Sequence, residues 1–211
     1  MPDWDNIFTE RGRVFTDPHS DMERVAKLIQ EKNGSRILDL GCGSGRHVVY
    51  LAHLGFDVYG FDASSKALNM AQEWLKEESL IATLRIHRME DPFPYEDDFF
   101  DAVISIQVIH HNLMKDIRNT ICEIERVLKP GGFLFVTFPV LRAAPASEED
   151  DWKLVKVEEG TYIPQSGWES GIPHHYFTEE EIPIEFQSFE IHDIYLDETN
   201  HRCVIARLSL S

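Results

Sequence analysis

The sequence is poor in cysteine. Its three cysteines, Cys42, Cys122 and Cys203, cannot all pair with one another, and no two of them form a CxxC motif. A disulfide framework is therefore not indicated. The sequence predicts a protein kept in a reducing, cytoplasmic setting.

Long apolar runs are also missing. No stretch approaches the roughly 20 apolar residues that a membrane-spanning helix requires. The first residues, MPDWDNIFTERGR, are acidic and aromatic, unlike a signal peptide. We therefore expect no membrane partner.

Basic side chains are scarce relative to acidic ones. The chain has 20 Lys and Arg against 37 Asp and Glu, which gives a formal net charge of -17, and it has no run of Lys and Arg. A strongly acidic surface repels phosphate backbones, so the composition argues against a nucleic-acid partner. Solubility alone is the simplest account of this charge.

What is present fits one α/β domain. The chain has 211 residues, of which 43% are hydrophobic, enough for a sizeable core. Short apolar runs alternate with segments of helical spacing, which predicts a parallel sheet with right-handed crossovers. The predicted strands are 36–40, 56–62, 82–86, 101–106 and 133–138, and the predicted helices are 21–33, 46–54, 64–75 and 114–128.

The two ends and one internal segment depart from this alternation. Residues 1–20 are interpreted as an irregular N-terminal arm, and residues 140–178, rich in Gly, Pro and charge, as an insertion or cap near the site. Residues 189–196 and 203–210 read as strands joined by a hairpin at 197–201, so the last strand should be antiparallel. The whole chain, 1–211, is predicted to form a single domain.

A glycine-rich loop follows the first predicted strand, in RILDLGCGSGRH at 36–47. Gly41, Gly43 and Gly45 allow a ligand close approach to the backbone before a helix N-terminus. However, Arg46 stands where a dinucleotide fingerprint has its third glycine, and the chain has no GxxxxGK[ST] motif. NAD is therefore disfavoured, and a P-loop is excluded.

Two acidic residues narrow the choice of ligand. Asp39 lies two residues before the first glycine, where a carboxylate repels a pyrophosphate but suits an ammonium group. Asp62 ends the second predicted strand, the position from which an acid accepts hydrogen bonds from ribose hydroxyls. A ribose, an ammonium group and no pyrophosphate together describe S-adenosylmethionine.

The segments DLGCGSGRH, DVYGFDAS, FDAVISIQVIHH and VLKPGGFLFV, in that order, resemble the class I S-adenosylmethionine-dependent methyltransferases. The resemblance covers roughly residues 20–140 and, more weakly, the closing hairpin. It implies a Rossmann-like, mostly parallel seven-stranded sheet of order 3-2-1-4-5-7-6, with strand seven antiparallel and helices on both faces. Strands here are numbered in the order in which they occur in the sequence.

The resemblance also implies which residues bind the cofactor. The loop residues and Asp39 would line its methionine and ribose, Asp62 would hold the ribose hydroxyls, and Ala63 would pack on the adenine. The loop HRMEDPF, 87–93, is one residue short of the family pattern, so the adenine amine could use Glu90 or Asp91. The predicted cofactor set is Asp39, Gly41, Cys42, Gly43, Gly45, Arg46, Asp62, Ala63, Met89, Glu90 and Gln107. For Arg46, simple solvent exposure is the alternative to binding the methionine carboxylate.

Two histidine pairs could converge at the carboxyl edge of the sheet. His110-His111 follows the fourth predicted strand and His174-His175 ends the inserted segment. The histidines could hold loops together, or His111 or His110 could act as a general base on the acceptor. Adjacent histidines usually point in different directions, so we expect no metal site.

For other side chains, the sequence does not distinguish a packing role from a functional one. The arm residues Trp4, Phe8, Arg13 and Phe15 could pack on the domain or form a lid. Aromatic residues of the inserted segment could form either its own core or an acceptor wall, namely Trp152, Tyr162, Trp168 and Tyr176. The acidic runs 148–151 and 179–181 read as solvated faces or helix starts, and Cys42 as a small loop residue rather than a nucleophile.

The predicted function is methyl transfer from S-adenosylmethionine to a small-molecule acceptor, whose attacked atom could be O, N, S or C. The alternative is a non-catalytic protein that binds the cofactor and supports a partner.

Overall fold

The computed structural model describes residues 4–13, 15–141 and 153–210. Within them, the main sheet has seven strands in the order β3-β2-β1-β4-β5-β10-β9. Strands β1 to β5 are parallel, and β10 is antiparallel to both neighbours. The strands are β1 (Arg36–Leu40), β2 (Asp57–Asp62), β3 (Thr83–Ile86), β4 (Phe100–Ile106), β5 (Leu128–Pro139), β9 (Phe189–Leu196) and β10 (His201–Leu208). The predicted sheet order and its antiparallel strand are confirmed.

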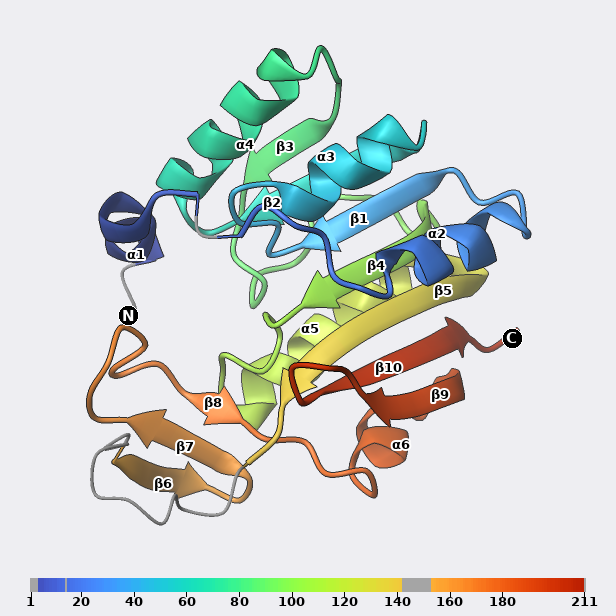
Figure 1. Ribbon diagram of the computed structural model, residues 1–211. Coiled ribbons are helices and arrows are strands. Elements are labelled where there is room, and N and C mark those ends of the chain that lie inside the picture. Colours follow the sequence, from blue (N-terminus) through green and yellow to red (C-terminus); the bar gives the residue numbers. More distant parts are fainter. Residues whose placement is uncertain (1–3, 14, 142–152, 211) are drawn as a thin grey trace.

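Helices cover both faces of this sheet (Figure 1). On one face lie α2 (Met22–Gln30), α3 (Arg46–His53) and α4 (Ser65–Glu77), and on the other α5 (Met114–Val127) and the short α6 (Ile182–Glu185). Successive strand residues serve opposite faces, as Ile37 packs with α2 and Leu38 packs with α5. Burial on both faces explains why the central strands read as continuous apolar runs.

The N-terminal arm contains a helix, α1 (Trp4–Arg11), where the sequence was read as irregular. This prediction was wrong because α1 buries no residue and has no apolar stripe of the kind that marks a packed helix. Contacts to other elements hold it instead. Asp5 accepts hydrogen bonds from the Ser64 and Ser65 hydroxyls, at 2.6 and 3.1 Å, and from the Lys66 amide at 3.1 Å.

The inserted segment forms a small antiparallel sheet of β6 (Leu154–Glu158), β7 (Thr161–Pro164) and β8 (His174–His175). Figure 1 shows this sheet and α1 beyond the arrowheads of β1, β4 and β5. Parallel sheets bind ligands at this carboxyl edge. Residues 142–152 lie outside the described residues, and with them Trp152 and the acidic run 148–151.

Two smaller points complete the fold. The expected turn at 129–132 lies within β5, where the pairing with β4 shifts register between Phe100 and Ala102. Among the residues described, no helix is long and apolar enough to cross a membrane.

Candidate functional site

The glycine loop between β1 and α3 is shaped by left-handed backbone. Gly41, Gly43 and Gly45 have φ angles of 72°, 52° and 93°. A Cβ on Gly41 would lie 2.4 Å from a Val108 methyl group, and one on Gly45 would lie 2.7 Å from the Ala71 Cβ. Two of these glycines therefore permit close packing against neighbouring segments as well as an open loop.

Asp62, at the tip of β2, is bound to this loop. Its carboxylate accepts hydrogen bonds from the Gly43 amide at 2.9 Å and the Ser64 amide at 2.8 Å. Ala63 is exposed next to it. The carboxylate thus ties the glycine loop to the start of α4, and it retains lone pairs for a ligand.

Asp39 is a buried carboxyl group with an unpaired oxygen. It is 1% exposed, and its Oδ2 has no hydrogen-bond partner among the described residues. Burial raises the pKa of Asp39 to about 7, with the Arg46 charge opposing this rise and the Asp62 charge adding to it. An unpaired buried acceptor is costly, so this site suits a cationic donor.

Arg46 is half-buried and in contact with the N-terminal arm. Its Nη1 lies 3.3 Å from the Asp17 carbonyl oxygen, and its guanidinium lies 5.0 Å from the centre of the Phe15 ring. The structure therefore does not leave this side chain freely in solvent.

Gln107, after β4, turns toward β5. Its backbone N–H and its Nε2 both donate to the Thr137 hydroxyl, at 3.0 and 3.1 Å, and its φ is 61°. A non-glycine residue with positive φ is uncommon and costs free energy. Holding this turn at the carboxyl edge of the sheet therefore lowers the stability of the fold.

The other predicted cofactor residues make contacts within the domain. Glu90 is ion-paired with Arg88, and the Met89 carbonyl accepts from the Thr120 hydroxyl at 2.9 Å. Cys42 is buried, with its Sγ directed at Gly60 on β2. Burial raises the pKa of this thiol well above its usual range, which fits the expectation that Cys42 is no nucleophile.

The two histidine pairs do converge. The His175 amide donates to the His110 carbonyl at 2.9 Å, which ties β8 to the loop after β4. The side chains of His110, His111 and His174 then cluster, with one ligating nitrogen from each within 4.8 Å of the others. The His110 and His111 ring centroids lie only 3.8 Å apart, so these neighbours do not point in different directions as expected.

Glu169 joins this cluster, and sequence analysis missed it. Its carboxylate oxygens lie 3.0 Å from His174 Nε2 and 3.6 Å from His111 Nε2. Burial lowers the pKa of His110 well below its usual range and also lowers that of His111. Burial acts to raise the Glu169 pKa, but hydrogen bonds with His111 and His174 lower it to about 2. Burial thus favours the neutral imidazole at His110 and His111, close to the Glu169 carboxylate.

His175, although adjacent in sequence, belongs to a different set of contacts. Its Nδ1 lies 2.8 Å from the Thr161 hydroxyl, and its Nε2 lies 3.0 Å from Glu181. Glu181 immediately precedes α6, so it marks a helix start as expected. His175 therefore holds β7, β8 and α6 together.

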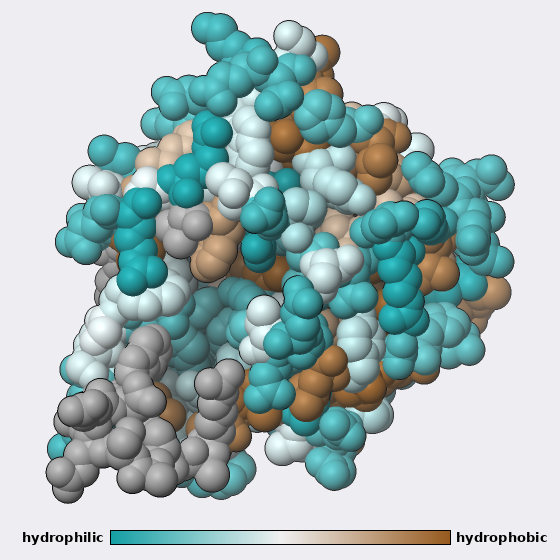
Figure 2. Space-filling view, in the orientation of Figure 1, coloured by the Kyte–Doolittle hydropathy of each residue, from teal (hydrophilic) through white to brown (hydrophobic). Residues whose placement is uncertain are grey.

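Helix α1 lies over this edge of the main sheet. The Trp4 ring meets His111 edge-on at 5.1 Å, and a Cβ on Gly43 would lie 3.4 Å from the Phe8 ring. Arg11 places its guanidinium 4.6 Å from the centre of the Trp168 ring. Figure 2 shows a hollow on this face, between α1 and the small sheet.

The remaining aromatic residues divide between two roles. Tyr162 and Tyr176 pack against each other with ring centroids 5.9 Å apart, as a small core of the insertion would. Trp168 contacts α1 instead. Arg13 contacts Trp74 on α4 at 4.6 Å, so the arm packs on the domain as well as covering the loop.

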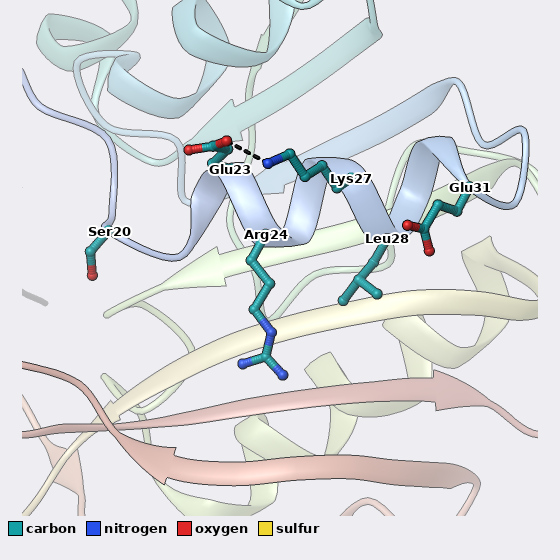
Figure 3. A pocket seen from close by; sticks show the side chains of 6 residues that line it. All are labelled: Ser20, Glu23, Arg24, Lys27, Leu28 and Glu31. Carbon is teal, nitrogen blue, oxygen red and sulfur yellow. Dashed lines mark hydrogen bonds and ion pairs between the residues drawn. The ribbon is translucent and has the colours of Figure 1, made fainter.

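A second hollow lies on the outer face of α2 (Figure 3). Its lining consists of Ser20, Glu23, Arg24, Lys27, Leu28 and Glu31. Lys27 pairs with Glu23 at 2.5 Å, and Arg24 pairs with Asp193 at 2.9 Å. These paired surface charges on a helix form no apolar pocket, and we assign the hollow no function.

The chain matches known methyltransferases along its central part. A family model described as a methyltransferase domain matches residues 38–136. An uncharacterised methyltransferase of Synechocystis is 29% identical over 147 residues, 64% of this chain and 67% of that protein. The central part of the chain, residues 38–136, is therefore similar to methyltransferase domains.

Other proteins similar to this chain differ in their named acceptors. A human protein named probable tRNA methyltransferase 9B is 34% identical over 62% of this chain, which spans only 28% of that protein. A ubiquinone biosynthesis O-methyltransferase of Mesorhizobium japonicum is 33% identical over 54% of this chain, spanning 44% of that protein. The names of these relatives therefore do not agree on one acceptor.

Solved structures agree with the fold of this chain. A methyltransferase of Methanosarcina mazei has a TM-score of 0.74 and 23% identity, covering 92% of this chain and 100% of that chain. Magnesium protoporphyrin IX methyltransferase of Synechocystis, solved with bound S-adenosylmethionine, has a TM-score of 0.67 and 17% identity, covering 97% and 91%. At these identities the likeness concerns the fold alone.

The residues present fit the cofactor that the family name implies. The unpaired Asp39 oxygen is the acceptor that an α-ammonium group requires, and it lies at the end of β1 directly before the glycine loop. Asp62 and the exposed Ala63 occupy the tip of the next strand. The donors and acceptors of this edge therefore match the ligand on chemical grounds.

Proposed function

We propose that this chain binds S-adenosylmethionine at the glycine loop and transfers its methyl group to a small-molecule acceptor. The observation that carries the proposal is the buried, unpaired carboxylate of Asp39 beside a glycine loop that Asp62 holds from the neighbouring strand. Asp39 would bind the ammonium group, Asp62 the ribose hydroxyls, and Ala63, Met89 and Glu90 would border the adenine. Gly41, Cys42, Gly43, Gly45, Arg46 and Gln107 would complete the methionine side.

The protein would contribute to methyl transfer chiefly by aligning the acceptor with the cofactor. When bound, the cofactor supplies an activated methyl group on a sulfonium. The protein must hold the acceptor atom in line with that methyl group and exclude water. Helix α1, the loop 107–113 and the small sheet border the hollow where an acceptor would lie (Figure 2). We propose that the arm and the insertion are parts of one domain, 1–211, that build this acceptor pocket.

A small acceptor is favoured by the charge and shape of this edge. The net charge of -17 opposes a polyanionic substrate, and a lid helix that contacts the insertion through Arg11 and Trp168 narrows the entrance. Relatives named for tRNA leave nucleic acid as the alternative acceptor class, and the experiment below includes it.

The predicted general base, His111 or His110, stays a prediction. Its test is turnover of His111→Ala and His110→Ala with the true acceptor. Full turnover in both variants would show that alignment suffices. A non-catalytic binding protein remains the competing proposal, and it predicts cofactor binding without transfer to any acceptor.

The first experiment is calorimetric titration with S-adenosylmethionine, S-adenosylhomocysteine and NAD side by side. We expect binding of the first two and none of NAD. Methyl-labelled cofactor is then incubated with the protein and either a small-metabolite extract or total tRNA. Label in the small-metabolite fraction supports the proposal, label in tRNA contradicts the acceptor class, and binding of NAD alone contradicts the cofactor.

A further inference from the structure

The imidazoles of His110, His111 and His174 form a compact nitrogen-rich cluster at the carboxyl end of β4. One nitrogen from each lies within 4.8 Å of the others. The His110 and His174 residues are 2% and 4% exposed, and His111 is covered by Trp4. Among the described residues, His110 Nδ1 and His111 Nε2 are buried without a hydrogen-bond partner, and a cation or a donor would satisfy them.

The protonation of His174 follows from its hydrogen bonds. Its Nδ1 lies 2.9 Å from the Ile172 carbonyl oxygen, which can only accept, so Nδ1 carries the proton. In the neutral ring, Nε2 then presents a lone pair. That lone pair faces a Glu169 oxygen at 3.0 Å, and two acceptors at this distance repel unless a proton or a metal ion lies between them.

The same arrangement recurs around the other oxygen of Glu169, which faces His111 Nε2 at 3.6 Å. His110 adds a buried Nδ1 with no hydrogen-bond partner among the described residues. A single ion would satisfy these groups together. The Nδ1–H of His174 bonded to a backbone carbonyl is the outer-shell contact that fixes the tautomer of a metal-binding histidine.

We propose that His110, His111, His174 and Glu169 bind a divalent transition-metal ion of the zinc class. Imidazole nitrogens with one carboxylate suit Zn²⁺, Co²⁺ or Ni²⁺ rather than Mg²⁺ or Ca²⁺. Zinc–nitrogen bonds of about 2.0–2.1 Å place tetrahedral ligands about 3.3 Å apart. The histidine nitrogens, now within 4.8 Å of one another, would therefore close on the ion, while His174 Nε2 and Glu169, now 3.0 Å apart, would separate slightly. A bound ion uses the lone pairs that a general base needs, so occupancy excludes that role for these histidines.

The chain offers one competing group, His19, Asp197 and Cys203, whose ligating atoms also lie within 4.8 Å of one another. There, however, Asp197 already accepts hydrogen bonds from Thr199 and from the His201 amide, at 2.8 Å each. Burial also raises the pKa of the Cys203 thiol to about 12, which opposes the thiolate that a metal requires. The experiment separates the two groups.

The test measures metal binding on the untagged full chain after removal of metals with a chelator. Equilibrium dialysis against Zn²⁺ is expected to give one ion per chain, and Co²⁺ to give the visible absorption of a tetrahedral site without a thiolate charge-transfer band. His174→Gln, His111→Gln and Glu169→Gln are each expected to weaken binding by about tenfold or more. Because no cofactor or acceptor is present, failure here leaves the proposed methyl transfer untouched.

Two variants serve as matched controls. His192→Gln removes an exposed histidine on β9, and Cys203→Ser removes the thiol of the competing group. Neither is expected to change affinity or stoichiometry. Circular dichroism checks that each variant is folded, and Zn²⁺ should raise the melting temperature of the wild type but not of folded His174→Gln. No stoichiometric binding, binding that survives His174→Gln, or binding lost in Cys203→Ser would each overturn the proposal.

Discussion

At the scale of single residues, Asp62 carries the clearest prediction. Its carboxylate both bonds the Gly43 amide and faces the proposed ribose position. We expect Asp62→Ala to weaken S-adenosylmethionine binding by about 10- to 100-fold, because hydrogen bonds to a charged group contribute about 1.5–3 kcal/mol each. Calorimetry measures the change. Asp57→Ala is the control, since Asp57 pairs with Arg36 at the opposite end of the same strand and should leave affinity unchanged.

Asp39 makes cofactor affinity depend on pH. In the free protein its carboxyl has a pKa of about 7, raised by burial, and an ammonium group needs it ionised. Affinity should therefore rise as pH increases toward about 7. It should fall again above about 8, where an α-amino group loses its proton. Titrations from acidic to mildly alkaline pH should give this bell-shaped dependence of affinity on pH. A flat profile would contradict the assignment of Asp39 to the ammonium group.

The matched variant is Asp39→Asn, which should abolish the acidic limb and weaken binding most near neutral pH, where the wild-type carboxyl is ionised. It should also raise the melting temperature of the free protein at neutral pH. The folded state holds the Asp39 proton more tightly than the unfolded chain does. Stability therefore falls as pH rises from about 4 to about 7, and the penalty is complete above that range. Asn carries no such penalty. An unchanged melting temperature would mean that Asp39 is better solvated than its burial indicates.

At the scale of elements, α1 should be the least stable helix around the site. None of its residues is buried, and Asp5 is its main polar link to α4. We expect the amides of 4–11 to exchange hydrogen faster than those of α4 and α5, and Asp5→Ala to accelerate them further. The global melting temperature should barely move, because Ser64 still caps α4 through the Ala67 amide. If the amides of α1 exchanged as slowly as those of the core helices, α1 would belong to the main cooperative unit.

The same elements show how far sequence reasoning reaches. Strands such as β1 and β4 could be predicted because burial on both faces demands apolar residues throughout. Helix α1 and strand β8 could not, because the first has no buried face and the second has two residues. Their geometry depends on tertiary contacts, which leave no local period.

The candidate site divides in the same way. Asp39 and Asp62 could be found because they lie at strand ends beside a glycine loop. Glu169 could not, since nothing in the loop GWESG marks one acid as facing two histidines. The convergence of the histidine pairs was foreseen from the sheet edge. Their shared direction depends on the backbone bond between His175 and His110.

At the scale of the whole molecule, charge decides between acceptor classes. A protein with net charge -17 that bound tRNA would need a local basic groove to neutralise phosphates, and its affinity would drop steeply with added salt. The described basic side chains near the site are instead engaged, as Arg46 is with Asp17 and Phe15, and Arg11 is with Trp168. We therefore expect no retention of labelled tRNA in a filter-binding assay, even at low salt.

Salt dependence makes this last prediction sharp. Should tRNA be retained, the slope of log affinity against log salt counts the phosphates neutralised, at about 0.7–0.9 per contact. Arg11→Ala would then lower that slope by about one if α1 forms the groove. Binding of tRNA with such a slope would contradict the small-acceptor proposal, because that proposal rests on repulsion between the acidic surface and phosphates. If no tRNA is retained and the methyl label appears in a small metabolite, the results would support the interpretation that the acidic surface repels polyanions from the glycine loop.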